Sequence, residues 1–160
     1  MNIFKVLSLD ISSTTIGWSV ISYNKISFNP VLESYGYIKP TKKTKNMSER
    51  ISDLEENISN LCKDLSDINY VIVEDYASFF KGGLSSAKTI ITLAIFNECT
   101  KFFLFKELKL LPEKASVHSI RSIISKKYNT NVKSKEEVLD FVINNFKNYE
   151  LKKNKLKNTR

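Results

Sequence analysis

Short apolar runs dominate the first forty residues. Residues 3–10 and 15–23 are β-branched and apolar stretches separated by the short segment "ISSTT", which predicts two antiparallel strands joined by a turn. A third strand is expected at 31–38. Between residues 48 and 65 the apolar positions recur at helical spacing with charged residues between them, so the chain continues as one amphipathic helix.

A second strand-to-helix segment follows. "NYVIVED", residues 69–75, is almost wholly apolar before its acids, as in a central strand covered on both faces. A long helix should begin near Ser85 or Ser86 and run through "AKTIITLAIFNECTKFFLFKEL". Its apolar residues occupy more than one stripe, which indicates deep burial or a surface shared with a partner subunit.

The last elements are short. We expect a brief strand at 115–118 and a helix capped by Ser119. The segment "SKEE" at 134–137 is a capping box, Ser134 with Glu137, that starts a further helix.

The expected order of elements is βββαβαβαα, without an internal repeat or a domain linker. This order predicts one α/β domain over residues 1–146, in three layers, with a mixed five-stranded sheet flanked by helices. The segment 147–160 is basic and lacks apolar periodicity, so we expect an exposed or disordered tail.

Net charge and composition indicate which classes of binding partner to expect. Lys and Arg exceed Asp and Glu by 25 − 17 = +8, which favours a polyanion such as nucleic acid or a membrane surface. An AT-rich coding bias would also raise lysine without a functional reason. No apolar run approaches the roughly 18 residues of a membrane span, and an acid interrupts the N-terminal apolar stretch. From these two features we expect no membrane partner. Cys62 and Cys99 form no CxxC pattern, so we expect reduced thiols in a cytoplasmic protein.

Two acids stand at the ends of apolar strands, Asp10 on the first and Glu74 on the fourth. If these strands are parallel neighbours, the carboxylates meet at one end of the sheet, where like charges resist full ionisation unless a cation neutralises them. Mg²⁺ suits sparse carboxylate sites that phosphate oxygens complete, and two metals about 4 Å apart can activate water for phosphodiester cleavage. Alternatively, Asp10 caps the turn at 11–14, and Glu74 or Asp75 is a solvated strand end.

Three segments carry a resemblance to a known family. "LSLDISSTTIGWSVI", then "VIVEDYA" after one helix, then a loop-led helix starting "SSAKT" resemble the RuvC-type Holliday junction resolvases of the RNase H-like superfamily, particularly their phage versions. The resemblance covers nearly the whole chain. It implies an RNase H-like fold and a homodimer packed through the helix at 85–107. It also implies binding and symmetric nicking of four-way DNA junctions with Mg²⁺ or Mn²⁺, and makes Asp10 and Glu74 catalytic metal ligands.

One departure from the family concerns the last acids. Such resolvases place a D-x-x-D pattern on a final helix, and this sequence ends in "KNTR" where that helix should start. Glu137 and Asp140 fall on the preceding helix and are not assigned as ligands. The chain is therefore expected to be truncated, or an altered member with a weakened metal site.

Candidate DNA contacts lie in three places. The loop "YASFFKGGLSSAK" combines aromatic rings, two glycines and lysines before a helix N-terminus, where phosphates are favoured and bases can stack. A second basic group surrounds the helix after residue 119, and two serines follow Asp10. The candidates are Ser12, Ser13, Tyr76, Phe79, Phe80, Lys81, Lys88, Arg121, Lys126, Lys127 and Lys133. Core burial of either Phe, or a solvated face for the second basic group, is the alternative.

Three functions are consistent with these features. The leading one is a structure-selective, metal-dependent endodeoxyribonuclease that binds and nicks four-way or other branched DNA. The second is a resolvase-like module that binds branched DNA without cutting. The third is a phosphotransferase of the actin and sugar-kinase type, because "DISSTT" also fits their phosphate loop; the chain is too short for two lobes and lacks a second phosphate loop, so no nucleotide cofactor is expected.

Overall fold

The computed structural model describes six segments of the chain, namely residues 3–12, 14–27, 30–39, 46–75, 86–130 and 132–145. They belong to two compact units, Met1–Val117 and His118–Arg160. The predicted domain 1–146 spans both units and remains a prediction, and the predicted tail 147–160 lies outside the described residues.

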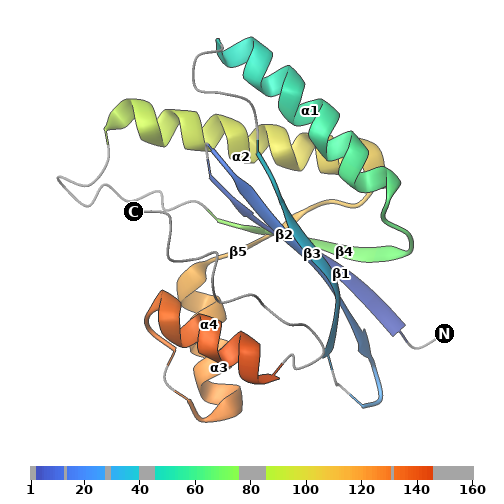
Figure 1. Ribbon diagram of the computed structural model, residues 1–160, viewed down its shortest axis with the longest axis vertical. Helices are drawn as coiled ribbons and strands as arrows, with labels where there is room; N and C mark the ends of the chain where they lie inside the picture. The colour runs from blue at the N-terminus through green and yellow to red at the C-terminus, as the bar shows by residue number, and fades with distance from the viewer. Residues whose placement is uncertain are drawn as a thin grey trace. The chain divides into compact units, whose positions relative to one another are not determined.

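The first unit contains a mixed five-stranded sheet with strand order β3-β2-β1-β4-β5 (Figure 1). The strands are β1 (Ile3–Ile11), β2 (Ile16–Asn24), β3 (Pro30–Ile38), β4 (Ile68–Glu74) and β5 (Glu113–Ala115). The first three form an antiparallel meander, whereas β4 is parallel to β1 and β5 is parallel to β4. The expected α/β fold with a mixed five-stranded sheet is therefore confirmed.

Two helices cover one face of this sheet, α1 (Met47–Lys63) and α2 (Ala87–Leu108) (Figure 1). Alternate residues of the strands point into the core beneath them. Leu7 and Leu9 of β1 and Val73 of β4 pack there with Phe96 and Leu104 of α2. Burying one such side chain contributes roughly 1.5–3 kcal/mol. Because the side-chain period of a strand is two, the residues between these positions face the other side of the sheet.

Helix starts follow their capping residues closely. Ser86 caps α2 by accepting from the backbone N–H of Thr89, at the predicted place. α1 begins with a capping box that the sequence analysis did not single out, in which Asn46 and Glu49 bond each other's backbone N–H groups. The pattern N-x-x-E before an apolar periodicity is the sequence signal for it.

The predicted strand at 115–118 is wrong in its bounds. β5 ends at Ala115, and α3 (Val117–Tyr128) begins two residues before the expected cap Ser119. The run from Ala115 to Val117 is too short for apolar periodicity to separate the end of a strand from the start of a helix.

The second unit contains α4 (Lys135–Asn145) and all of α3 after its first residue. Here the predicted capping box is confirmed, since Glu137 N–H donates to Ser134 Oγ and Ser134 N–H donates to the Glu137 carboxylate. Lys133 N–H donates to the same carboxylate at 2.7 Å. These backbone bonds lower the pKa of Glu137, which explains the acid at this position structurally.

Both cysteines are free thiols, as expected. Burial, with a smaller contribution from Glu107, raises the pKa of Cys62 to about 11, so this thiol stays protonated and is a poor metal ligand. Among the described helices, none is long and apolar enough to cross a membrane.

Candidate metal centre and nucleic-acid interface

The two acids at the strand ends lie side by side. In the parallel pair of β1 and β4, Leu9 is opposite Val73, so Asp10 and Glu74 occupy the next position of the same register. Leu9 and Val73 belong to the core beneath α1 and α2, and the side chains of Asp10 and Glu74 therefore project from the opposite face. Adjacent strands are about 4.8 Å apart, so the sheet itself brings the two carboxylates together.

The same position continues across the whole sheet. Asp10 is opposite Gly17 of β2, Gly17 is opposite Tyr37 of β3, and Glu74 is opposite Ala115 of β5. We call these five residues, Tyr37, Gly17, Asp10, Glu74 and Ala115, the carboxylate row. They share one face of the sheet, because residues directly opposite each other on neighbouring strands point to the same side.

A tight turn fixes the position of Asp10. After the buried Ile11, Ser12 N–H donates to the Thr15 carbonyl at 3.0 Å, and Ser12 Oγ both donates to this carbonyl and accepts from Thr15 N–H. The Ser/Thr cluster therefore holds the hairpin closed. Asp10 itself is exposed on β1, and the bonds that close this turn among the described residues come from Ser12.

A buried asparagine holds the end of β4. Asn97 of α2 is 1% exposed, and its Nδ2 donates to the backbone carbonyl of Glu74 at 3.1 Å. On the other side, Asp75 N–H donates to the Ala115 carbonyl at 3.0 Å. The backbone at the end of β4 is therefore tied both to α2 and to β5.

Asp75, the neighbouring acid, has a different environment. Its carboxylate lies 3.8 Å from Lys114 Nζ, and Lys114 Nζ is also 3.4 Å from Glu98 of α2. Lys101 donates a hydrogen bond to Glu98, and this bond is the main reason why the pKa of Glu98 is lowered. Asp75 therefore belongs to an ion-pair network, whereas the register of β1 with β4 places Glu74 beside Asp10.

The donors of this site suit a hard divalent cation. Asp10 and Glu74 supply carboxylate oxygens, which Mg²⁺ prefers. Among the described residues of the first unit, a Cβ on Gly17 beside Asp10 would meet no atom within 4 Å, so these residues leave space next to the carboxylates. Within the described residues, no group of three or more His, Cys, Asp or Glu side chains is close enough to hold a metal.

Comparison with solved structures identifies proteins of similar fold. No protein-family model matches the sequence, and no curated protein matches it. Thermus thermophilus RuvC in complex with a Holliday junction substrate aligns with a TM-score of 0.69 at 13% identity, over 90% of this chain and 79% of that chain. A second Thermus thermophilus RuvC structure aligns with a TM-score of 0.65 at 16% identity, over 90% and 81%.

The yeast mitochondrial Holliday junction resolvase Ydc2 aligns with a TM-score of 0.61 at 16% identity, over 87% of this chain and 60% of that chain. The three alignments cover 87–90% of this chain. The chain has the RuvC fold. The predicted RNase H-like architecture is therefore confirmed, and the carboxylate row occupies the carboxyl end of the parallel pair in a RuvC-like sheet.

The predicted DNA contacts of the first unit fall into two groups. Ser12 and Lys88 are described: the Ser12 hydroxyl is engaged in the hairpin turn, and Lys88 is exposed in the first turn of α2 of this RuvC-like domain. The others lie outside the described residues: Ser13, Tyr76, Phe79, Phe80 and Lys81.

In the second unit, Arg121 has a structural partner. Its Nη1 donates to the Lys133 carbonyl and ties α3 to the segment before α4. Lys126 and Lys127 are exposed in the last turn of α3, where cations interact favourably with the helix dipole, and Lys133 is exposed as well. That these four basic residues contact DNA phosphates remains a prediction.

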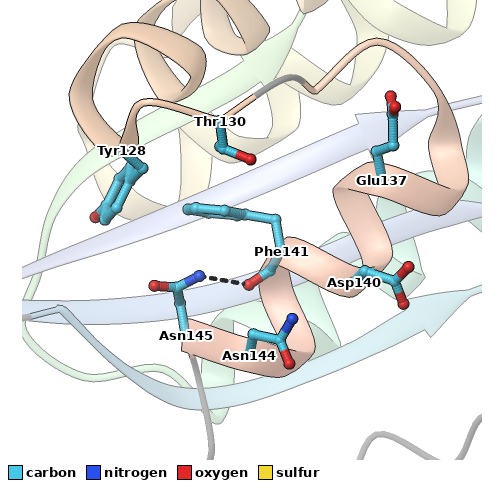
Figure 2. Close-up of a pocket in the computed structure, with 7 residues that line it drawn as sticks. All are labelled: Tyr128, Thr130, Glu137, Asp140, Phe141, Asn144 and Asn145. Atoms are coloured by element: carbon cyan, nitrogen blue, oxygen red, sulfur yellow. Dashed lines mark hydrogen bonds between the residues drawn. The ribbon is translucent and has the colours of Figure 1, made fainter.

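A pocket of about 350 Å³ also lies in the second unit, and Figure 2 shows the side chains that line it. The lining residues are Tyr128, Thr130, Glu137, Asp140, Phe141, Asn144 and Asn145. Tyr128 and Phe141 meet edge to face, and Asn145 Nδ2 donates to the Phe141 carbonyl. The carboxylate of Glu137 is engaged in its capping box, so Asp140 is the other acid among the lining residues. One carboxylate does not make a metal centre.

Two residues beside the carboxylate pair are not singled out by the sequence analysis. Asn97 was read only as part of a helix, although a lone amide in an apolar helical stretch is a signal for a buried hydrogen bond. Tyr37 was read as part of a third strand, and its place in the carboxylate row follows only from the register of β2 with β3.

Proposed function

We propose that this chain is a structure-selective, metal-dependent endodeoxyribonuclease that binds and nicks four-way or other branched DNA. The observation that carries the proposal is the pairing of Asp10 with Glu74 at the carboxyl end of two parallel strands in a RuvC fold. The solved relatives include a RuvC bound to a Holliday junction and a mitochondrial Holliday junction resolvase, which supports the substrate class.

Asp10 and Glu74 would hold Mg²⁺ or Mn²⁺ through their carboxylate oxygens. Such a cation, when bound, lowers the pKa of water and stabilises the oxygen that leaves the phosphodiester. The residues of the chain do the positioning: Ser12 closes the turn after Asp10, Asn97 holds the carbonyl of Glu74, and Gly17 leaves room beside them for the sugar-phosphate backbone.

A homodimer through α2 belongs to the same proposal. Ile91, Phe102 and Phe105 are exposed, and their spacing puts them on one side of the helix, opposite the side that carries Phe96 and Leu104. Two copies packed along this side would cover apolar surface that a monomer leaves in water. A dimer also presents two carboxylate pairs, as two nicks in one junction require.

A resolvase-like module that binds branched DNA without cutting is the second candidate. The observation that favours it is the two-acid site, since the described residues add no third acid to Asp10 and Glu74. Fewer carboxylates bind a divalent cation more weakly, while the contacts between lysines and phosphates do not depend on the metal.

A gel assay separates the two candidates. A labelled four-way junction and a matched linear duplex are incubated with the chain, in Ca²⁺ to measure binding and in Mg²⁺ to measure nicking. We expect paired nicks in the junction and none in the duplex, and Asp10→Asn should abolish nicking while it leaves junction binding largely intact. Equal cleavage by Asp10→Asn would refute the metal site, and binding without nicks would favour the second candidate.

Asp67→Asn is the matched control. Asp67 is an exposed aspartate just before β4, at the end of this strand that is remote from Glu74. Its φ of 59° lies in the left-handed region, which asparagine also adopts, so the substitution leaves the backbone unstrained. The same loss of charge at this place should change neither binding nor nicking.

A further inference from the structure

An exposed aromatic ring stands in the carboxylate row. Tyr37 of the edge strand β3 is 62% exposed, and Lys39 Nζ lies 5.3 Å from the centre of its ring. The neighbouring residues on the other side of β3 face the core. The Trp18 indole packs against Gly36 and the core, and Ile38 is buried. Tyr37 and Lys39 are thus a ring and a cation that the core leaves at the surface.

The register fixes where this pair lies relative to the metal carboxylates. Tyr37 is opposite Gly17, and Gly17 is opposite Asp10, so the ring and the carboxylate project from the same face two strand spacings apart, about 10 Å. Gly17 has no side chain, and a Cβ at its place would meet no described atom of the first unit within 4 Å. A DNA strand that passes over Gly17 can therefore reach Asp10 and Tyr37 at once.

We propose that Tyr37 and Lys39 form a nucleotide-binding site for the DNA strand that is cleaved. The Tyr37 ring stacks on an unpaired base next to the phosphate held at Asp10, and the Lys39 ammonium binds a neighbouring phosphate. Aromatic rings stack on bases of any sequence, and lysine contacts with phosphate position DNA without reading it. This inference rests on the proposed nuclease function and adds a reason for its selectivity.

The selectivity follows from the stacking surface. Inside a continuous duplex both faces of a base are covered by neighbouring bases, whereas a base at a branch point can lose one neighbour. A ring beside the metal carboxylates therefore binds branched DNA better than linear duplex, through contacts that do not depend on sequence. Tyr37 acts on the substrate next to the reacting phosphate and takes no proton in the reaction.

Substitutions at Tyr37 test the site. Tyr37→Ala should weaken junction binding in Ca²⁺ by about 5- to 150-fold, which is the range expected from losing one base stack, and should lower the preference for junction over duplex. Tyr37→Phe keeps the ring and should restore both. Tyr70→Ala is the matched control: Tyr70 is 44% exposed on the same face, four residues before Glu74 or about 13 Å along β4.

Lys39→Gln tests the cation separately. It should reduce the slope of log affinity against log salt concentration by about one, because one phosphate contact is lost. A merely structural role of Lys39 would leave that slope unchanged.

Crosslinking identifies the contact directly. Junctions with 5-iodouracil beside the nicked phosphate, irradiated in complex with the wild-type chain, should crosslink to the peptide that contains Tyr37, and mass spectrometry locates the bond. Wild-type binding and nicking that persist unchanged in Tyr37→Ala, or crosslinks only elsewhere, would overturn this inference and leave the nuclease proposal standing. A wild-type chain that binds no branched DNA would overturn both.

Discussion

Replacing Asn97 by aspartate tests how β4 is held. Asn97 Nδ2 donates to the Glu74 carbonyl, and its Oδ1 is buried without a hydrogen-bond partner among the described residues. Asn97→Asp puts an oxygen where the donor was, so an ionised side chain would face a carbonyl in a site that is 1% exposed. Burial raises the pKa of such an aspartate in the folded state above its value in the unfolded chain, about 3.9.

The pH dependence has a definite sign. The folded variant binds more protons than the unfolded chain between the two pKa values, so its free energy of unfolding falls as pH rises, by about 1.4 kcal/mol per pH unit. Between pH 5 and pH 7 the variant should therefore lose up to about 3 kcal/mol relative to wild type. Asn97→Ala lacks the charge, and should cost about 1–3 kcal/mol at either pH because it removes the buried hydrogen bond to the Glu74 carbonyl.

Urea denaturation at the two pH values measures these differences, and the fluorescence of Trp18, the one tryptophan of the sequence, reports unfolding. Asn60→Asp on the exposed side of α1 is the control and should show no comparable loss. Equal, pH-independent destabilisation by Asn97→Asp and Asn97→Ala would refute the reasoning, because it would mean that the residue 97 carboxylate reaches water.

Two further substitutions test the packing and the proposed dimer. Gly36→Ala should destabilise the fold by about 1–3 kcal/mol and shift Trp18 emission, because a Cβ at Gly36 would lie 2.8 Å from Trp18 Cζ2; an unchanged urea midpoint and spectrum would contradict this contact. Phe102→Glu, at a side chain 61% exposed on α2, should convert the dimer to a monomer in sedimentation velocity without lowering the melting temperature. A wild-type monomer, or a variant that still dimerises, would exclude this surface.

The strands and the carboxylate pair could be predicted because their signals are local. An apolar run that ends in an acid marks both Asp10 and Glu74. The Ser/Thr-rich segment between the first two apolar runs predicts the hairpin of β1 and β2. The parallel pairing of β1 with β4 needed one more step, since a helix separates them and parallel neighbours require such a crossover. The sequence analysis states this pairing only as a condition, and the structure meets that condition.

Other features depend on contacts between distant residues and have no local signal. The bond from Asn97 to the Glu74 carbonyl joins residues 23 positions apart, and apolar periodicity does not reveal which helix face meets a strand end. Likewise, the place of Tyr37 depends on the register of β2 with β3, which shifts by a bulge after Val20. A sequence pattern gives the two faces of β3 but not the residue opposite Gly17.

Alternation along β1 links the stability of the fold to the position of the site. Leu7, Leu9 and Ile11 fill the core, and Asp10 projects from the other face between two of them. A slip of one residue in the pairing with β4 would turn Asp10 inward and Leu9 outward. Each leucine exposed by the slip would lower the free energy of unfolding by roughly 1.5–3 kcal/mol. Burial of the Asp10 carboxylate would cost several kcal/mol more in desolvation. The apolar residues thus specify the register that sets Asp10 beside Glu74, so the carboxylate pair needs no attraction of its own to form.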